Sequence, residues 1–371
     1  MEDRYIATIL LHSVGDTLGF KNGDWEFFTK KSYNEILEKL YEFIDLGGIN
    51  DINLDGWLVS DDTILHMSIV ESLLSKYSSS DELNNNTVKN IIKACESMIV
   101  DEQHERNRYM GVAVRKHYIK LKNGENWKKF AFDHMGGGNG SAMRCHCIGL
   151  AFFGSENRRK LIQYAIDSSR MTHVNPIGWL GGLSTAIFTA FAIEEVHINK
   201  WIPTLLDIIA GEQVKQNVDM ENRDESKAYE TFIQAWKTYY ESRFVDGIPR
   251  KTKSHTNPIQ RVIYYNSLFD SNSQQGDMAL GSKFGMSGYS AVIVAYDCLI
   301  DAKDSWEKLV VYSILNNFDS DTIGAIACGL FGAIYGLSKV PRNNVIYIEN
   351  KETIIKMGNK MFRKYYKHEK I

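Results

Sequence analysis

The segment IGAIACGLFGAIYGL, Ile323–Leu337, places small residues along one side of the helix that it predicts. They occupy two adjacent rows with a spacing of four: Gly324, Ala325, Cys328, Gly329, Gly332, Ala333 and Gly336. Residues four apart lie on the same side of an α-helix. Because each glycine lowers helix propensity by up to about 1 kcal/mol, such a helix needs tight contact with other helices. The segment therefore predicts a central, buried helix that rigidly supports whatever precedes it.

The same helical period runs through most of the chain. Only five of the 371 residues are proline. Apolar residues recur every three or four positions, for example at Ile64, Leu65, Met67, Val70, Leu73 and Leu74. Sustained alternation of apolar and polar residues, which is typical of strands, is hard to find. The sequence predicts an all-α fold in a single domain, residues 1–371, with the polar stretch 78–86 (SSSDELNNN) as a loop.

Composition and charge argue against several classes of function. The formal net charge is −3, with 43 basic and 46 acidic residues, which does not favour a nucleic-acid-binding surface. The apolar run at 323–337 is shorter than the ~20 residues that cross a bilayer, and no targeting segment is recognisable. The triplet Cys145-His146-Cys147 lacks a partner pair of zinc-site spacing, so it is better interpreted as buried side chains. We expect a monomeric cytoplasmic protein with no nucleic-acid or membrane partner.

Two similar acidic motifs begin predicted helices far apart in the chain. They are Ser60–Thr63 (SDDT) and Asp319–Thr322 (DSDT), and the second directly precedes the small-residue segment. One carboxylate at a helix start is common, since it accepts hydrogen bonds from free backbone N–H groups. A second carboxylate adds repulsion that costs free energy unless a cation lies between the two. If the two helix starts converge, their four carboxylates predict a site for divalent cations such as magnesium, manganese or calcium rather than zinc.

Isoprenoid synthases also bind magnesium through two aspartate-rich helical motifs, and they are a distant alternative. Their motif requires a further aspartate three residues after the pair, where this chain has Leu65. The basic residues that would hold a diphosphate are not found near the two motifs either. The sequence therefore favours another family of magnesium-binding helical proteins.

Five segments in a fixed order carry a resemblance to such a family. They are SVGDTLGFKNGDWEF (13–27), VSDDTILH (59–66), GGGNGSAMRCHCIGL (136–150), SRMTHVNPIGWLGGL (169–183) and DSDTIGAIACGLFGAIYG (319–336). With these segments the chain resembles the ADP-ribosylglycohydrolase family, and most closely the ADP-ribosylarginine hydrolases. The resemblance covers a motif-bearing core of about residues 1–340 and leaves a helical C-terminal tail at 341–371.

The resemblance implies an orthogonal helical bundle with a binuclear magnesium centre, two Mg²⁺ ions per chain. It implies hydrolysis of the N-glycosidic bond between ADP-ribose and arginine on mono-ADP-ribosylated proteins, with ADP-ribose as the product. Asp62 and Glu26 are then the candidates for proton transfer; Asp62 is preferred for the arginine leaving group, and Glu26 is the alternative that orients a water. Asp61 is expected to act mainly through metal occupancy. The implied metal ligands are Ser60, Asp61, Asp62, Asp319, Asp321 and Thr322.

The glycine-rich stretch at 136–140 has a physical interpretation beside the resemblance. Glycines permit positive φ and close approach, so their amides can face a pyrophosphate without a basic side chain. Asn139 and Ser141 would add contacts, His173 would hold the ligand, and the loop at 281–289 is weakly similar to the adenosine-side loop of the family. The predicted substrate-binding residues are Gly136, Gly137, Gly138, Asn139, Gly140, Ser141, His173, Ser287 and Gly288.

A departure from the family pattern keeps two other functions open. Relatives usually have Gly-Gly before the last D-x-D, whereas this chain has Asn317-Phe318, and a phenylalanine there would crowd the ribose or change which leaving group fits. The first alternative is a non-catalytic paralogue that binds ADP-ribose without turnover. The second is a hydrolase of another linkage, to serine or in O-acetyl-ADP-ribose.

Overall fold

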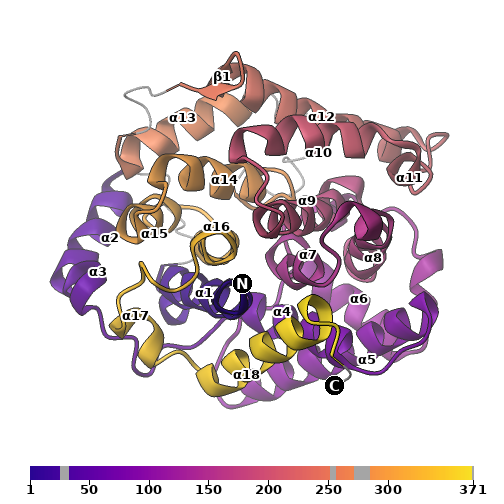
Figure 1. Ribbon diagram of the computed structural model, residues 1–371, viewed down its shortest axis with the longest axis horizontal. Coiled ribbons are helices and arrows are strands. Elements are labelled where there is room, and N and C mark those ends of the chain that lie inside the picture. The colour runs from indigo at the N-terminus through magenta and orange to yellow at the C-terminus, as the bar shows by residue number, and fades with distance from the viewer. Residues whose placement is uncertain (26–32, 251–255, 271–284, 370–371) are drawn as a thin grey trace.

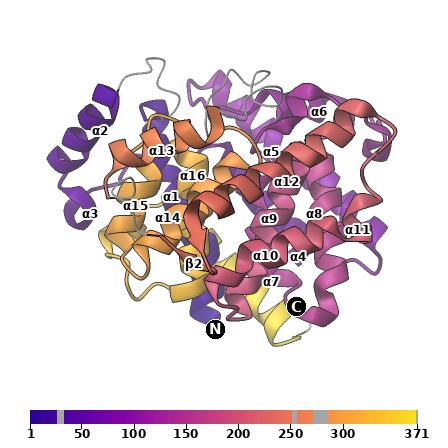
Figure 2. The ribbon, with the colours of Figure 1, turned by 90° about the horizontal axis from the view of Figure 1, so that it is seen from above.

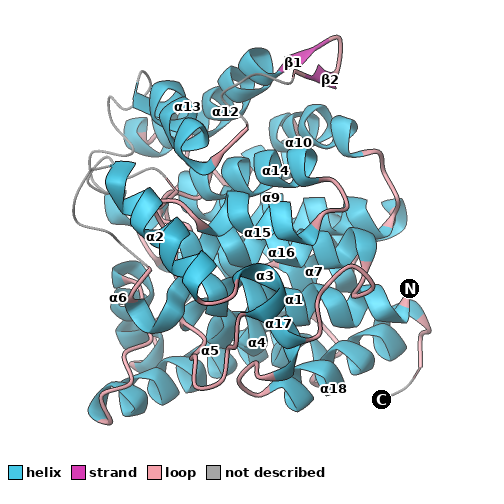
Figure 3. Ribbon diagram, turned by 90° about the vertical axis from the view of Figure 1, so that its left-hand side faces the viewer, coloured by secondary structure: helices cyan, strands magenta, loops and turns pink. Residues whose placement is uncertain are grey.

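The computed structural model describes residues 1–25, 33–250, 256–270 and 285–369. Almost all of its regular structure is helical, which confirms the all-α prediction (Figure 3). The described strands are a single two-residue antiparallel pair, β1 (Phe244–Val245) and β2 (Ile248–Pro249), at the end of a long helix. The core is therefore made by packing helix against helix.

The centre of the molecule is the crossing of α1 (Glu2–Phe20) with α16 (Ser320–Tyr335), which lie side by side in Figure 1. Their backbones touch through glycines. A Cβ atom added to Gly15 would lie 2.2 Å from the carbonyl oxygen of Gly324, and one added to Gly332 would lie 2.5 Å from the backbone of Ala7. Residues 320–333 are all buried. The prediction of a central, tightly packed helix at 323–337 is confirmed.

Further layers stack on both sides of this pair (Figures 1 and 3). On one side lie α9 (Pro176–Ile193) and α14 (Ser290–Ala302), which are covered by α12 (Arg223–Arg243). On the other side lie α4 (Asp61–Leu74) and α18 (Lys351–Met361). The C-terminal tail packs closely on α1, because a Cβ at Gly358 would lie 2.9 Å from the Cα of Ile6.

The other helices surround these layers, with α2 and α3 at one end of the molecule and α11 at the other (Figure 2). They are α2 (Tyr33–Asp45), α3 (Gly48–Asp51), α5 (Ser80–Gln103), α6 (Val112–Lys122), α7 (His146–Ala151), α8 (Arg158–Arg170), α10 (Trp201–Ala210), α11 (Glu212–Lys215), α13 (Pro258–Asp270), α15 (Trp306–Ile314) and α17 (Asn343–Ile346). Short 3-10 turns lie at Lys21–Gly23, Trp127–Lys129, His134–Gly137, Ala142–Arg144, Ser155–Asn157 and Ile198–Lys200, and a π-helical turn lies at Phe362–Tyr366.

One sequence expectation is corrected by this architecture, and one apolar helix was not singled out from the sequence. The stretch 78–86 is not one loop, because α5 begins at Ser80 and Ser79 caps it by accepting a hydrogen bond from the Glu82 N–H at 3.2 Å. Within the described residues, α9 is long and apolar enough to cross a membrane, and all of its residues are buried within the protein. A buried helix of a large core passes the same test of length and composition.

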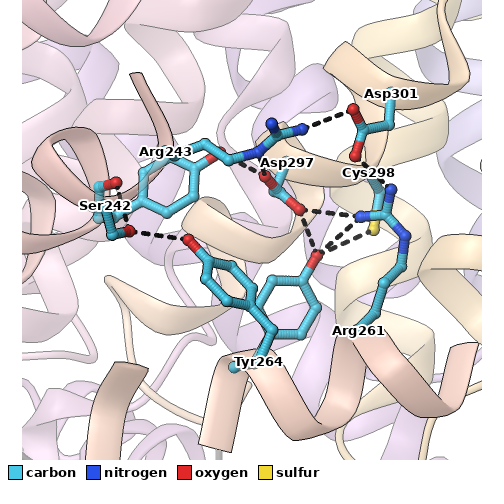
Figure 4. A network of polar contacts seen from close by, with 9 residues as sticks. Ser242, Arg243, Arg261, Tyr264, Asp297, Cys298 and Asp301 are labelled. Carbon is cyan, nitrogen blue, oxygen red and sulfur yellow. Dashed lines mark hydrogen bonds and ion pairs between the residues drawn. The ribbon is translucent and has the colours of Figure 1, made fainter. Parts of the chain in front are cut away.

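A buried polar network joins α12, α13 and α14 away from the central crossing (Figure 4). Asp297 is fully buried and accepts hydrogen bonds from Arg243 and Arg261, each at 2.8 Å, and both arginines also bond to Asp301. Buried charges are tolerated when they are paired in this way. The network holds the outer helices in register on the core.

Candidate active site

The first acidic motif begins α4, and Asp16 of α1 anchors it. The buried Asp16 carboxylate accepts hydrogen bonds from the backbone N–H groups of Ser60 and Thr63, each at 3.1 Å. Ser60 is the N-cap residue, and its Oγ accepts a hydrogen bond from the Asp62 N–H at 3.1 Å. These contacts satisfy backbone donors that a helix leaves free at its N-terminus. The backbone of Asp61 and Asp62 is thus fixed relative to α1.

The second acidic motif begins α16, with Asp319 as its N-cap residue. The Ser320 hydroxyl donates to the carbonyl oxygen of Trp25 at 2.7 Å. The buried Lys39 of α2 donates to the same oxygen at 2.6 Å. Burial lowers the pKa of Lys39 to about 7, while the neighbouring charge of Asp321 acts against that shift. A lysine from outside the motif therefore lies beside it.

The two helix starts meet in space although they are far apart in the sequence. The Thr322 hydroxyl donates to Asp62 Oδ1 at 3.3 Å, across 260 positions. Asn139, from the glycine-rich stretch, donates from Nδ2 to Asp319 Oδ2 at 2.8 Å. The structure thus brings both acidic motifs and the glycine-rich stretch together.

A cavity of about 270 Å³ opens at this meeting point. The predicted site residues that line it are Asp61, Asp62, Gly138, Asn139, Gly140, His173, Asp319, Asp321 and Thr322. The rest of the wall is mainly apolar and consists of Tyr109, Gly111, Val112, Ala113, Val114, Met135, Met143 and Met286. The cavity therefore has an acidic side and a glycine-rich side, with an apolar remainder.

Other predicted site residues are described but do not line this cavity: Ser60, Gly136, Gly137, Ser141, Ser287 and Gly288. The Ser141 hydroxyl donates to the carbonyl oxygen of Gly178. The hydroxyl groups of Ser287 and Ser290 are hydrogen-bonded to each other at 2.8 Å. A Cβ at Gly288 would lie 2.0 Å from the carbonyl oxygen of Ile177. These residues support the wall from behind. Glu26 and residues 281–284 lie outside the described residues.

Two amides of the glycine-rich stretch are already used within the protein. The Gly136 N–H donates to the Asp133 carbonyl oxygen at 2.9 Å, and the Asn139 N–H donates to that of Met286 at 3.0 Å. The backbone amides that can still face a pyrophosphate, as predicted, are therefore those around Gly138 and Gly140. Gly140 also permits close approach of the His173 ring, since a Cβ there would lie 2.8 Å from His173 Cε1.

His173 is held in a fixed orientation in the cavity wall. Its Nδ1 lies 2.8 Å from the Thr172 hydroxyl oxygen, and the residue is buried. Burial, with the nearby charge of Arg144 adding to it, lowers the pKa of His173 well below its ordinary value. The imidazole is therefore neutral and suited to hydrogen bonding rather than to charge pairing.

The carboxylates of the first motif are strongly perturbed. Burial raises the pKa of Asp61 to about 8, and repulsion from Asp16 and Asp319 adds to this effect. The pKa of Asp62 is raised well above its ordinary value by burial and by repulsion from Asp16, Asp61 and Asp319. Burial also raises the pKa of Asp16 to about 6, although its hydrogen bonds to Thr63 and Ser60 oppose the shift. A bound cation would remove much of this penalty.

The donor set fits a hard divalent cation. Carboxylate and hydroxyl oxygens line one cavity, and Asp62 Oδ2 is buried without a hydrogen-bond partner among the described residues. In the described part of the chain, no three acidic, histidine or cysteine side chains already surround a common point closely enough to hold an ion. Magnesium does not require such a cage, because it keeps several waters and usually binds through one or two carboxylates. The fit is thus one of chemistry and charge.

Several residues of this region were not found from the sequence. Asp16 belongs to the segment 13–27 that resembles the family, but its role as an anchor of α4 depends on a contact between helices. Tyr109 lines the cavity in a left-handed backbone conformation, φ 56°, with its ring edge-on to Phe20 at 5.5 Å. The Gly111 N–H donates to Asp61 Oδ2 at 3.2 Å. No motif marked the segment that contains Tyr109 and Gly111.

Two relatives of known name are similar over most of this chain. A protein of Acanthamoeba polyphaga mimivirus, named as an ADP-ribosyl glycohydrolase, is 34% identical over 340 residues, which cover 90% of this chain and 64% of that protein. This chain therefore spans slightly less than two thirds of the viral protein. The ADP-ribosylhydrolase ARH1 of Dictyostelium discoideum is 31% identical over 93% of this chain and 90% of its own length.

A third relative and a solved structure extend the comparison. The ADP-ribosylhydrolase ARH3 of Xenopus tropicalis is 24% identical over 82% of this chain and 81% of its own length. A solved chain from an ADP-ribosylglycohydrolase-related protein complex superposes with a TM-score of 0.58 over 98% of both chains, at 18% identity, which shows a shared fold. The sequence model of the ADP-ribosylglycohydrolase family matches residues 1–370. On this evidence, the chain belongs to the ADP-ribosylglycohydrolase family of hydrolases.

Proposed function

We propose that this protein hydrolyses the N-glycosidic bond between ADP-ribose and arginine on mono-ADP-ribosylated proteins, with magnesium as cofactor, and so reverses the modification. The observation that carries the proposal is the meeting of two acidic helix starts and a glycine-rich stretch around one cavity. Membership of the family supports glycoside hydrolysis. The relative named ARH1 is more similar to this chain than the relative named ARH3, which supports the arginine linkage that the resemblance implies.

Magnesium would be held by oxygens of Asp61, Asp62, Asp319, Asp321 and Thr322, with Ser60 as a further candidate ligand behind them. When bound, two ions would supply positive charge at the ribose hydroxyls and near the anomeric carbon. On the other side of the cavity, the backbone around Gly138 and Gly140 would face the pyrophosphate. Neutral His173 would add a hydrogen bond to the ligand. The two sides together would orient the ribose between the carboxylates and the glycine-rich stretch.

In the reaction, a water oxygen bonds to the anomeric carbon while the bond from that carbon to the guanidine nitrogen breaks. The water gives up one proton and the leaving nitrogen takes one up, so the net reaction adds one water across the bond. Asp62 is the preferred group for this proton transfer, because its buried Oδ2 lies in the cavity wall without a hydrogen-bond partner among the described residues. Glu26 is the second candidate for proton transfer, or orients the attacking water. The apolar part of the wall would limit the access of bulk water.

The departure at Asn317-Phe318 does not argue strongly for a non-catalytic protein. Neither residue is among the described residues that line the cavity. A Cβ at Gly285 would lie 3.3 Å from the Phe318 Cβ, so this side chain packs against the loop before α14. Every carboxylate of the two motifs is retained. ADP-ribose binding without turnover is therefore the less favoured of the two candidate functions.

The test compares release of ADP-ribose from arginine-linked, serine-linked and O-acetyl-ADP-ribose, each with magnesium and with a chelator. The proposal expects magnesium-dependent release that is fastest from arginine, and loss of release in the Asp61→Asn plus Asp321→Asn variant. Faster release from serine or O-acetyl-ADP-ribose would replace the arginine assignment. Binding of ADP-ribose without release from any of the three substrates would establish the non-catalytic alternative.

A further inference from the structure

A buried arginine lies behind the first acidic motif and is held by two carboxylates. Arg108 is 3% exposed and bonds Glu349 through both ends of its guanidinium group, from Nη1 at 2.8 Å and from Nη2 at 3.0 Å. Its Nε donates to Asp101 at 2.7 Å. Such a bidentate pair fixes orientation as well as distance. Burial alone would raise the pKa of Glu349, but the hydrogen bonds from Arg108 and from the Val59 N–H outweigh it and lower the pKa.

The same two residues hold the peptide groups on both sides of Ser60. Arg108 Nη1 donates to the Val59 carbonyl oxygen at 2.7 Å, and the Val59 N–H donates to Glu349 at 3.1 Å. The backbone carbonyl oxygen of Arg108 accepts the Asp61 N–H at 3.0 Å. The Arg108–Glu349 pair therefore contacts three backbone groups immediately before or within the first acidic motif.

With these contacts, every backbone N–H from 59 to 63 has an acceptor. Asp16 of α1 accepts hydrogen bonds from the N–H groups of Ser60 and Thr63, and the Ser60 hydroxyl oxygen accepts one from the Asp62 N–H. Glu349 accepts the Val59 N–H, and the carbonyl oxygen of Arg108 accepts the Asp61 N–H. The motif is thus held from two directions. One support comes from α1, and the other comes from Arg108, after α5, together with Glu349 of the C-terminal tail, 241 positions further on.

Core packing is incomplete beside this second support. A cavity of about 380 Å³ lies behind α4 and is lined by Val59, Thr63, Arg108 and Glu349, among others. An open volume provides few van der Waals contacts to hold the backbone beside it. On this side the hydrogen bonds to Arg108 and Glu349 therefore hold the backbone of the motif where packing is incomplete.

We propose that Arg108 and Glu349 are positioning residues for the carboxylates of Asp61 and Asp62, so that the C-terminal tail belongs to the scaffold of the active site. The turnover part of this inference rests on the proposed function. Residues behind metal ligands commonly change metal affinity or activity by about 10- to 100-fold when they are altered. A change of that size is expected here, at a residue that touches neither metal nor substrate.

The chain offers a matched control in the pair Arg158–Glu194. Arg158 Nη2 donates to both carboxylate oxygens of Glu194, at 2.8 and 2.7 Å, and Glu194 also accepts the Gly154 N–H at 2.7 Å. The side chain of Glu194 is 18% exposed, compared with 25% for that of Glu349. Both glutamates accept hydrogen bonds from one arginine and one backbone N–H, and neither lines the candidate active-site cavity, but only Glu349 bonds to the backbone beside the first acidic motif.

The experiment compares wild type, Glu349→Gln, Arg108→Lys and Glu194→Gln in the full chain. It measures Mn²⁺ affinity by calorimetry, kcat and KM for arginine-linked ADP-ribose, thermal stability, and amide hydrogen exchange of residues 59–63. All three variants should lose some thermal stability. Only Glu349→Gln and Arg108→Lys should lose metal affinity and kcat, each by about 10- to 100-fold, and show faster exchange at 59–63. Glu194→Gln should match wild type in these three readouts.

The inference would be overturned if Glu349→Gln and Arg108→Lys had metal affinities, kcat values and exchange rates within twofold of those of Glu194→Gln. A loss of thermal stability in Glu349→Gln would not change that conclusion. Failure of the proposed function gives a different pattern. If wild type binds Mn²⁺ but releases no ADP-ribose, metal affinity and exchange still decide the role of Arg108 and Glu349. If wild type binds no metal, hydrogen exchange at 59–63 decides it alone.

Discussion

Asn139 donates a hydrogen bond from Nδ2 to the Asp319 carboxylate at 2.8 Å, which ties the glycine-rich stretch to the second acidic motif across 180 positions. The same Nδ2 also donates to the Gly285 carbonyl oxygen at 2.8 Å. One amide group thus connects the two sides of the cavity and fixes one oxygen of a predicted metal ligand. The contact links the residues expected to bind phosphate with those expected to bind metal.

Asn139→Ala should lower kcat/KM by about 10- to 100-fold, because a hydrogen bond to a charged group contributes about 1.5–3 kcal/mol. The control is Asn84→Ala, which removes a partly buried hydrogen bond of 2.8 Å from the buried Asn84 to Asp167, away from the cavity. Steady-state kinetics on arginine-linked ADP-ribose provide the measurement. Equal losses of kcat/KM in the two variants would show that Asn139 has no special role in the site.

Asp16→Asn should weaken both stability and metal binding. An asparagine has one acceptor oxygen and its amide NH₂ group would face backbone N–H donors, so at least one of the bonds to Ser60 and Thr63 is lost. We expect a loss of about 1–3 kcal/mol in unfolding free energy, with weaker Mn²⁺ binding.

The control for Asp16→Asn is Asp219→Asn, because the Asp219 carboxylate accepts backbone N–H bonds from Glu221 and Asn222 at an exposed turn. Denaturant unfolding and calorimetry measure the two effects. Unchanged Mn²⁺ affinity in Asp16→Asn would contradict the assignment of Asp16 as the anchor of the first motif.

Gly15→Ala should destabilise the fold strongly. The added Cβ would lie 2.2 Å from the Gly324 carbonyl oxygen, which is backbone and cannot move aside as a flexible side chain can. Forced overpacking of this kind costs about 3 kcal/mol or more. For comparison, a Cβ at Gly111 meets open space and its φ of −58° suits alanine, so Gly111→Ala should change stability little. A similar unfolding midpoint for both variants in urea would contradict the tight α1–α16 crossing.

The stability of the metal-free protein should depend on pH through Asp61. The folded state raises its pKa to about 8, so this carboxyl keeps its proton when folded and releases it on unfolding. Stability is therefore lost as pH rises from the unfolded-state pKa, near 4, toward the folded-state value. In excess chelator, Asp61→Asn should become increasingly more stable than wild type between about pH 5 and pH 8. A difference between the two proteins that stays constant with pH would exclude this explanation.

The central helix and the acidic side of the cavity were predictable because both depend on local sequence patterns. The small residues of Ile323–Leu337 fix how closely a neighbour approaches, and the structure places α1 there with Gly15 against Gly324. The two acidic motifs indicated a shared cation site by their unbalanced charge. Their meeting in one cavity follows from the central position of α16, next to α1 and α4.

The supporting contacts were not predictable, because each one joins residues that share no local pattern. Glu349 lies in the tail beyond the recognised motifs, and its contact with Arg108 exists only in the folded chain. The start of α5 at Ser80 differs from the expected loop for another reason. The polar composition of 78–86 suggested a loop, although Ser79 followed by Glu82 is a capping-box spacing that marks a helix start.

Release of ADP-ribose from an arginine-linked substrate, followed in magnesium, after chelation and after magnesium is restored, tests the central claim most directly. The account predicts release in magnesium, loss of release in chelator, and recovery when magnesium returns. It also predicts no recovery in Asp61→Asn plus Asp321→Asn. Undiminished release in chelator, or no release by wild type at saturating magnesium, would contradict the claim that the two acidic helix starts form one magnesium-dependent hydrolytic centre.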